Sequence, residues 1–314
     1  MFTAIAESLA VLLLLIAIAM GLRRSGVISQ DDGATLARLV TDLVLPALVF
    51  ASLSRHALEW QRLMPGLTML ATTLILLLVA WWVGRKLGLK ARQLGAFILV
   101  AGIGSSSTLG YTLVGQVFPG DMEAAFAAVM VGEIGVILPL FLVGVPVAIH
   151  FGDQDQTAGA HKRELVRFLK SPLFIALVSG LAVSSLPLPE NSIKTVVFRA
   201  LDILGAALPV FVALSIGLML RPVSIRKIGA VIVAVLTIKL LLEPLMVLEL
   251  ATLEHMNHLE KNVLVIEAAM PSGTLAAIIA TRYGCDGGLA SVLVVVSYVA
   301  SLLSIPLVAI LASM

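Results

Sequence analysis

The stretch AGIGSSSTLG at residues 101–110 decides the fold, because it interrupts an apolar run that is long enough to cross a membrane. It contains two glycines followed by four consecutive hydroxyl residues. Glycine costs helix stability, and Ser and Thr side chains compete for backbone hydrogen bonds. The sequence therefore predicts that the helix expected over 93–118 is broken near residues 103–107.

A second interruption, MPSGT at residues 270–274, lies in the apolar run 261–282, where the proline removes a backbone donor and clashes with the preceding turn. The two interruptions hold corresponding places in the two halves of the chain. Four short matches recur at offsets of 163 to 167 residues, pairing Leu45-Pro46 with Leu208-Pro209, Thr108-Leu109 with Thr274-Leu275, Asp121 with Asp286, and Leu138-Pro139 with Ile305-Pro306.

The composition identifies an integral membrane protein. Of the 314 residues, 60% are hydrophobic and 13% charged, whereas soluble domains have about 45–50% apolar and about 25% charged residues. We therefore expect an all-α membrane fold. Apolar runs bounded by charge, Gly or Pro predict ten transmembrane helices, over 4–22, 34–54, 64–84, 93–118, 122–149, 168–187, 193–220, 228–250, 261–282 and 286–312.

Five helices per half is an odd number, so the second half would enter the membrane inverted relative to the first, as in many secondary transporters. We expect a first five-helix repeat over 1–150, a cytoplasmic linker over 151–167, and a second, inverted repeat over 168–314. The basic residues support this topology, since 14 fall on one side and 5 on the other. The positive-inside rule then places both termini on the non-cytoplasmic side of the cell's inner membrane.

Several classes of protein are excluded by the composition. Ten spans leave no room for a separate soluble domain, and there is no phosphate-binding loop of an ATP-driven pump. The single cysteine, Cys285, allows no internal disulfide and no cysteine cluster for a metal. A net charge of +2 gives no reason to expect nucleic acid as a partner. We expect no cofactor and no metal site.

The paired breaks predict a binding site at the middle of the membrane. Unwound backbone is tolerated there only where it is packed in protein or lines a cavity. The free N–H groups and hydroxyls suit an anion, above all a carboxylate. The alternative is that these small residues only let helices pack closely. The predicted substrate-binding residues are Gly104, Ser105, Ser106, Ser107, Thr108, Tyr111, Pro271, Ser272, Gly273 and Thr274.

Several motifs together resemble the auxin efflux carrier family, which includes plant pin-formed transporters and bacterial permeases associated with malonate, malate and similar carboxylates. They are DLVLPALVF at 42–50, the serine-rich break, MPSG at 270–273, RYG at 282–284 with Asp286, and SIPL at 304–307. The resemblance covers essentially the whole chain. Family members often carry Asn-x-Gly-x-x-Gly-x-Pro at the first break, and of those positions only Gly110 keeps the pattern here.

The resemblance implies a ten-helix fold in which helices 4 and 9 are broken and cross. It also implies that helices 1, 2, 6 and 7 form a scaffold that dimerises. Helices 3–5 and 8–10 would form a transport unit that moves against this scaffold.

Ionisable residues within spans are costly and mark functional candidates. Asp42 is expected to pair with Arg38, one turn earlier. Lys239 and Glu243 lie four residues apart, so they either neutralise each other or leave Lys239 as a counter-charge for a carboxylate. Two further acids, Glu133 and Glu267, are candidates for carrying a coupling proton, because an acid beside an anion site repels substrate unless it is protonated. Glu133 has the alternative of being tied to a neighbouring helix.

The sequence thus predicts a secondary carrier of a small organic anion, a mono- or dicarboxylate, with a proton or sodium ion as a possible coupling partner. An anion channel is the main alternative, because channels also use broken helices. An intramembrane serine hydrolase is the enzyme alternative. It would need Lys239 as the base for the serines at 105–107, because all five histidines fall in loops or at span ends.

Overall fold

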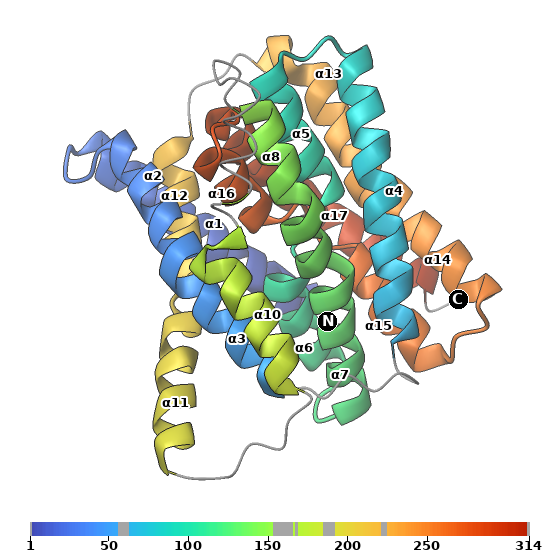
Figure 1. The fold of residues 1–314 in the computed structure, drawn as a ribbon. Coiled ribbons are helices and arrows are strands. Elements are labelled where there is room, and N and C mark those ends of the chain that lie inside the picture. The colour runs from blue at the N-terminus through green and yellow to red at the C-terminus, as the bar shows by residue number, and fades with distance from the viewer. Residues whose placement is uncertain are drawn as a thin grey trace.

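The computed structural model describes residues 2–55, 63–152, 166, 169–184, 192–220 and 225–312, which form a bundle of helices (Figure 1). The first half contains α1 (Phe2–Arg24), α2 (Gln30–Leu39), η1 (Val40–Val44), α3 (Leu45–Arg55), α4 (Met64–Lys86), α5 (Ala91–Gly102), η3 (Ser106–Gly110), α6 (Tyr111–Val117), α7 (Met122–Met130), η4 (Val131–Ile137), η5 (Leu140–Gly144) and α8 (Val145–Gly152). The second half contains α10 (Pro172–Ser184), α11 (Ser192–Ala206), α12 (Leu208–Met219), α13 (Ile225–Leu236), η6 (Thr237–Leu242), α14 (Glu243–Leu253), α15 (His258–Ala268), α16 (Thr274–Arg282) and α17 (Gly287–Ala312).

Six helical runs among the described residues are long and apolar enough to cross a membrane: Asp31–Ala51, Met64–Lys86, Glu123–Gly152, Lys194–Met219, Ile228–Leu253 and Gly287–Ile305. The spans expected over 93–118 and 261–282 are not among them, because each is divided at its break into separate helices. The ten-span inverted repeat therefore remains a prediction. Most of the linker expected over 151–167 lies outside the described residues.

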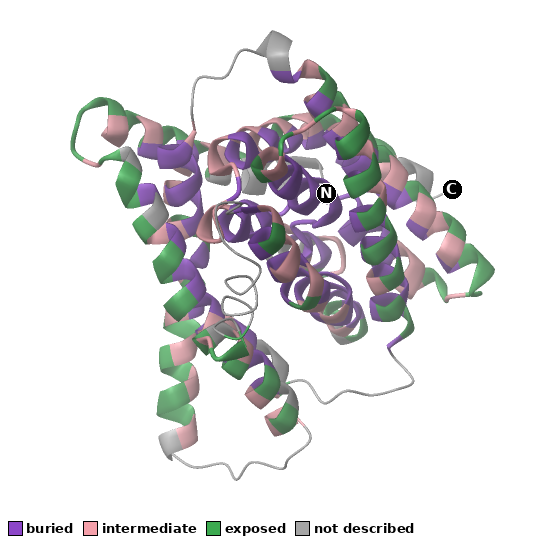
Figure 2. Cartoon of the chain, turned by 45° about the horizontal axis from the view of Figure 1, so that its top comes forward, coloured by how far each residue is buried: buried purple, intermediate pink, exposed green. Residues whose placement is uncertain are grey.

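The two divided runs form the centre of the molecule. Every residue of 94–102 in α5 and of 274–280 in α16 is buried. A helix that is apolar on all sides is stable only where other elements surround it. Figure 2 shows this as buried backbone in the middle of the bundle, with exposed residues on the outer helices.

The outer face of α4 presents apolar side chains away from this centre. Leu78 is 67% exposed and Trp82 is 58% exposed. At the end of the same helix, Arg85 lies over the ring of Trp81 and Lys86 over the ring of Trp82, at 5.2 and 5.6 Å from the ring centroids. Tryptophan beside basic residues at the end of an apolar helix is typical of a membrane–water interface.

The helices pack in two groups. The first helix group consists of α1, α2, η1, α3, α10, α11 and α12, with α3 packed on α10 and with α1 and α2 packed on α12. The second helix group contains α4–α8 with their π-helical turns, together with α13–α17, and packs around α5, α15 and α16. The most extensive contacts fall within each group, and α16 provides much of the contact between them.

Four of the described π-helical turns precede prolines. Each ends two residues before its proline: η1 before Pro46, η4 before Pro139, η5 before Pro146 and η6 before Pro244. A proline inside a helix clashes with the carbonyl four residues earlier, and a widened turn relieves that clash. As a result, Asp42, Glu133 and Lys239 each lie in a widened turn, a feature often found at functional sites.

Cys285 lies in the turn between α16 and α17 and is 3% exposed, with its thiol donating to the carbonyl of Ala148 at 3.5 Å. Burial raises the pKa of this thiol to about 12. An unfolded cysteine has a pKa near 8.5, so the thiolate fraction at pH 8 is lower in the folded protein by roughly a thousandfold. We expect maleimide labelling of Cys285 to be slow in mild detergent and rapid after denaturation in SDS.

The control is Cys285→Ala/Ser25→Cys, whose cysteine replaces the exposed Ser25 and should label quickly in both conditions. Equal labelling rates for Cys285 in mild detergent and in SDS would contradict its burial.

Candidate functional site

The two helix breaks meet and pair as short extended segments. The Ser105 N–H donates to the Pro271 carbonyl at 2.9 Å, and the Gly273 N–H donates to the Ile103 carbonyl at 2.7 Å. These bonds form an antiparallel bridge between Gly104 and Ser272. A broken helix leaves backbone groups without intrahelical partners, and here the two breaks provide partners for each other. Pro271 fits this role because the pairing uses its carbonyl and needs no N–H.

Glycines leave room for close contacts on both sides of this bridge. A Cβ atom on Gly273 would lie 2.5 Å from the Gly104 carbonyl oxygen. A Cβ atom on Gly104 would lie 2.6 Å from the Lys239 Nζ atom. The breaks therefore bring the two backbones into direct contact and place the Lys239 ammonium against them.

Two of the predicted hydroxyl donors at the breaks, those of Ser105 and Ser106, are buried and already engaged within the protein. The Ser105 hydroxyl shares a hydrogen bond of 2.7 Å with the Tyr298 hydroxyl. The Ser106 hydroxyl donates to the Glu267 backbone carbonyl at 3.3 Å. The backbone N–H of Ser272 donates to the Ser297 hydroxyl at 3.1 Å, whereas the buried Ser272 hydroxyl has no hydrogen-bond partner among the described residues. Thr274 is also buried, whereas the side chains predicted at Ser107 and Thr108 lie outside what the structure describes.

A cluster of buried charges lies beside the breaks. Lys239 forms an ion pair with Glu243, and both are fully buried, which confirms that the two residues can neutralise each other. Glu267, at the end of α15, is also fully buried, and within the described part of the chain neither of its carboxylate oxygens has a hydrogen-bond partner. A Cβ atom on Gly110 would overlap with the Glu267 carboxylate, so α15 and η3 are in close contact at this point.

Tyr111 and Glu133 link the breaks to a cavity. The Tyr111 hydroxyl donates to Glu133 Oε1 at 3.3 Å. Both side chains line a cavity of about 290 Å³ that lies between the two helix groups. Leu275, in the first turn of α16 after the second break, lines the same cavity. Among the predicted substrate-binding residues, Tyr111 is the one that lines this cavity.

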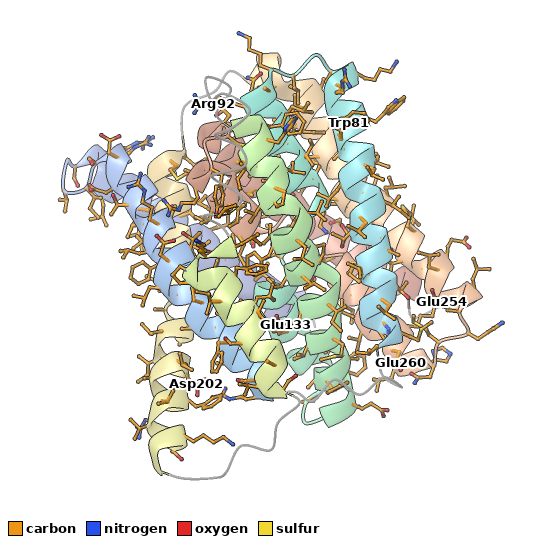
Figure 3. All side chains as sticks on the ribbon, in the orientation of Figure 1. Trp81, Arg92, Glu133, Asp202, Glu254 and Glu260 are labelled. Carbon is orange, nitrogen blue, oxygen red and sulfur yellow. The ribbon has the colours of Figure 1, made fainter. Side chains whose placement is uncertain are left out.

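An ion pair between two helices of the first helix group also lines the cavity. Arg55 at the end of α3 donates to Asp202 of α11 at 2.8 Å. Sequence reasoning missed both residues as site candidates. They lie 147 positions apart, with Arg55 just beyond the predicted span 34–54 and Asp202 within the predicted span 193–220, so no local pattern connects them. Figure 3 shows Asp202 toward one end of the molecule and Glu133 nearer the middle of the bundle.

The expected pairing of Asp42 with Arg38 is wrong. The structure pairs Asp42 with Arg282 at the end of α16, at 3.1 Å, and Arg38 is exposed. The physical reason is the widened turn η1, which contains Asp42 and changes the angular spacing that a regular helix would give to residues 38 and 42. Asp42 therefore connects the two helix groups, and it lies away from the breaks.

The comparisons with known proteins agree with the resemblance in the sequence. A family model described as membrane transport protein matches residues 4–309. The chain is 28% identical to an uncharacterized transporter of Methanothermobacter thermautotrophicus over 304 residues, which cover 96% of each chain. It is 26% identical to an uncharacterized transporter of Methanocaldococcus jannaschii over 267 residues, which cover 83% of each chain.

The bridge between the breaks gives a direct stability prediction. Gly273→Ala forces a methyl group against the Gly104 carbonyl, and we expect it to lower the free energy of unfolding by about 1–3 kcal/mol, the usual cost of overpacking. The matched control is Gly229→Ala in α13, where the added Cβ has no atom within 4 Å. Thermal unfolding followed by tryptophan fluorescence in detergent measures both, and equal midpoints for the two variants would contradict the close contact.

Proposed function

We propose that the chain is a secondary carrier of a small organic anion. The chain belongs to the membrane transport protein family, and its motifs resemble those of the auxin efflux carriers. The proposed substrate is a mono- or dicarboxylate, and the proposed location is the cytoplasmic membrane. The observation that supports it best is the meeting of two helix breaks beside a cavity that separates two helix groups. Discontinuous helices at the centre of the membrane are typical of binding sites in alternating-access carriers.

The proposed movement follows from the packing. The first helix group corresponds to expected helices 1, 2, 6 and 7, and the second group to expected helices 3–5 and 8–10. Since contacts are most extensive within each group, the second group can rock or slide as a unit against the first. Such a movement would expose the cavity to opposite sides of the membrane in turn, while the bridge at Gly104 and Ser272 stays intact.

We further propose the ten-span inverted repeat, with both termini on the non-cytoplasmic side, and a homodimer formed through the first helix group. The distribution of charge supports the orientation. Figure 3 shows Arg92 at one end of the bundle and Asp202, Glu254 and Glu260 toward the opposite end. The end with Arg92 also carries Arg85 and Lys86 and would face the cytoplasm under the positive-inside rule.

Counterflow in proteoliposomes tests the carrier. We expect vesicles preloaded with an unlabelled substrate to accumulate the labelled form transiently and with saturable kinetics, because one site is exposed to each side in turn. The first probes are malonate, malate, lactate and indole-3-acetate, and vesicles without protein are the control. Single-channel currents in a planar bilayer, combined with uptake that does not saturate, would contradict a carrier and favour the channel.

Glu267 is the proposed carrier of a coupling proton. Lys239, Ser106 and Tyr111 face it from three other elements, and Lys239 is already paired with Glu243. An ionised carboxylate without a partner is costly inside a membrane. We expect Glu267→Gln to lose the dependence of substrate flux on a pH gradient, because an amide cannot exchange a proton. The control is Glu123→Gln, which changes an exposed carboxylate on α7.

Flux through the Glu267→Gln protein that keeps the full wild-type dependence on the pH gradient would remove Glu267 from this role. The carrier itself would still stand, with another residue or sodium as the source of coupling.

A further inference from the structure

The cavity between the helix groups has an ion pair at its mouth. The side chains of Arg55 and Asp202 are 42% and 51% exposed, so their ion pair lies at the surface end of the cavity. The Arg55 guanidinium is also held over the ring of Phe198, 4.9 Å from its centroid. A guanidinium presents several N–H donors in a planar fork that matches a carboxylate. Arg55 is therefore positioned to bind the carboxylate of a ligand in place of Asp202.

The inner part of the cavity holds a second acidic side chain, that of Glu133. Glu133 is 6% exposed, and Tyr111 donates to one of its oxygens. If a ligand bound to Arg55 carried a second carboxylate at its far end, that group would face the Glu133 carboxylate. The surroundings have a low dielectric constant, so repulsion between the two like charges would be strong. A hydroxyl or ammonium group would instead donate a hydrogen bond to the Glu133 carboxylate.

The walls between the two ends are aliphatic. Leu45, Leu48 and Val49 line the cavity from α3, and Val129, Ile137 and Leu275 line it from the second helix group. Its volume of about 290 Å³ lies just below the range of about 300–1,000 Å³ for small-molecule sites. The cavity therefore fits a short molecule with an apolar body.

From this arrangement we infer that the cavity selects an aliphatic monocarboxylate with a hydrogen-bond donor at its far end, and that it discriminates against dicarboxylates. The inference rests on the proposed function and narrows its substrate class. Arg55 binds the carboxylate of the substrate, and Glu133 accepts from the distal donor. Asp202 competes with the substrate for Arg55, so it holds the guanidinium in place while the site is empty.

Four compounds with the same six-carbon chain test this selection: 6-hydroxyhexanoate, 6-aminohexanoate, hexanoate and adipate. Binding to the purified full chain in detergent is measured by calorimetry, independently of transport. We expect the compounds with a hydroxyl or an ammonium group to bind at least about fivefold more tightly than hexanoate. Adipate should bind at least about tenfold more weakly than 6-hydroxyhexanoate, which corresponds to about 1.4 kcal/mol.

The variants separate the two ends of the cavity. Arg55→Gln should weaken the binding of 6-hydroxyhexanoate by about tenfold or more, the scale of a lost charged hydrogen bond. Asp202→Asn should strengthen the binding of 6-hydroxyhexanoate, because the carboxylate that competes for Arg55 is gone. Since this change is opposite in direction to that of Arg55→Gln, the test stays decisive if Arg55→Gln folds poorly. Glu133→Gln should reduce the discrimination against adipate to less than about threefold. Thermal unfolding of each variant without ligand checks that the fold is kept.

Three outcomes would overturn the inference: adipate binding as tightly as 6-hydroxyhexanoate, unchanged discrimination in Glu133→Gln, or no binding of any of the four compounds. None of these decides whether the protein is a carrier. Failure of the proposed function is observed separately, as the absence of counterflow with a compound that binds.

Discussion

The pairing of backbone between the two helix breaks is the constraint on which the rest of the structure depends. Inside a membrane an unsatisfied N–H or carbonyl group costs several kcal/mol, so neither break is stable without the other. The hydrogen bonds from Ser105 to Pro271 and from Gly273 to Ile103 satisfy both. Glycine at 104 and 273 allows the approach, because a side chain at either position would meet backbone or Lys239. The central helices α5, α15 and α16 are therefore joined at one point, and the second helix group packs around them.

This junction also explains where the buried charges lie. The Lys239 ammonium is next to Gly104, just beyond the C-terminal end of α5, where the partial negative charge of the helix stabilises a cation. Glu243 pairs with Lys239, and Glu267 lies close to both Lys239 and Ser106. One ammonium thus faces two carboxylates. The cluster has one negative charge in excess when all three groups are ionised, and a proton on Glu267 removes it. This balance of charge is the electrostatic basis for the proposal that Glu267 carries a coupling proton.

Local sequence predicted the parts of this arrangement that depend on neighbouring residues. The glycines and the proline predicted both breaks, and the four-residue spacing predicted that Lys239 and Glu243 could pair. Contacts between distant segments were beyond such reasoning: Arg55 and Asp202 are 147 residues apart, and Asp42 and Arg282 are 240 residues apart. The π-helical turns add a second limit, since η1 changes the angular spacing on which the pairing of Asp42 with Arg38 was based. The hydroxyl groups of the breaks were predicted as free donors, but Ser105 and Ser106 bond within the protein.

The ion pairs differ in how much they contribute to stability, according to whether they lie within a helix group or between the two groups. Lys239 and Glu243 are fully buried in the second group, and removing one partner of such a pair typically costs about 3–5 kcal/mol, because the other charge is left buried without a partner. The pair between the groups, Asp42 with Arg282, is 46% and 30% exposed, and exposed pairs are worth about 0–1 kcal/mol. Among the ion pairs of the described residues, movement of one group against the other therefore breaks the weak, solvent-exposed pair of Asp42 with Arg282, while the strong pair moves as part of its group. In the proposed alternating access, the weak ion pair thus lies at the boundary between the two helix groups, and the strong ion pair lies inside the group that moves.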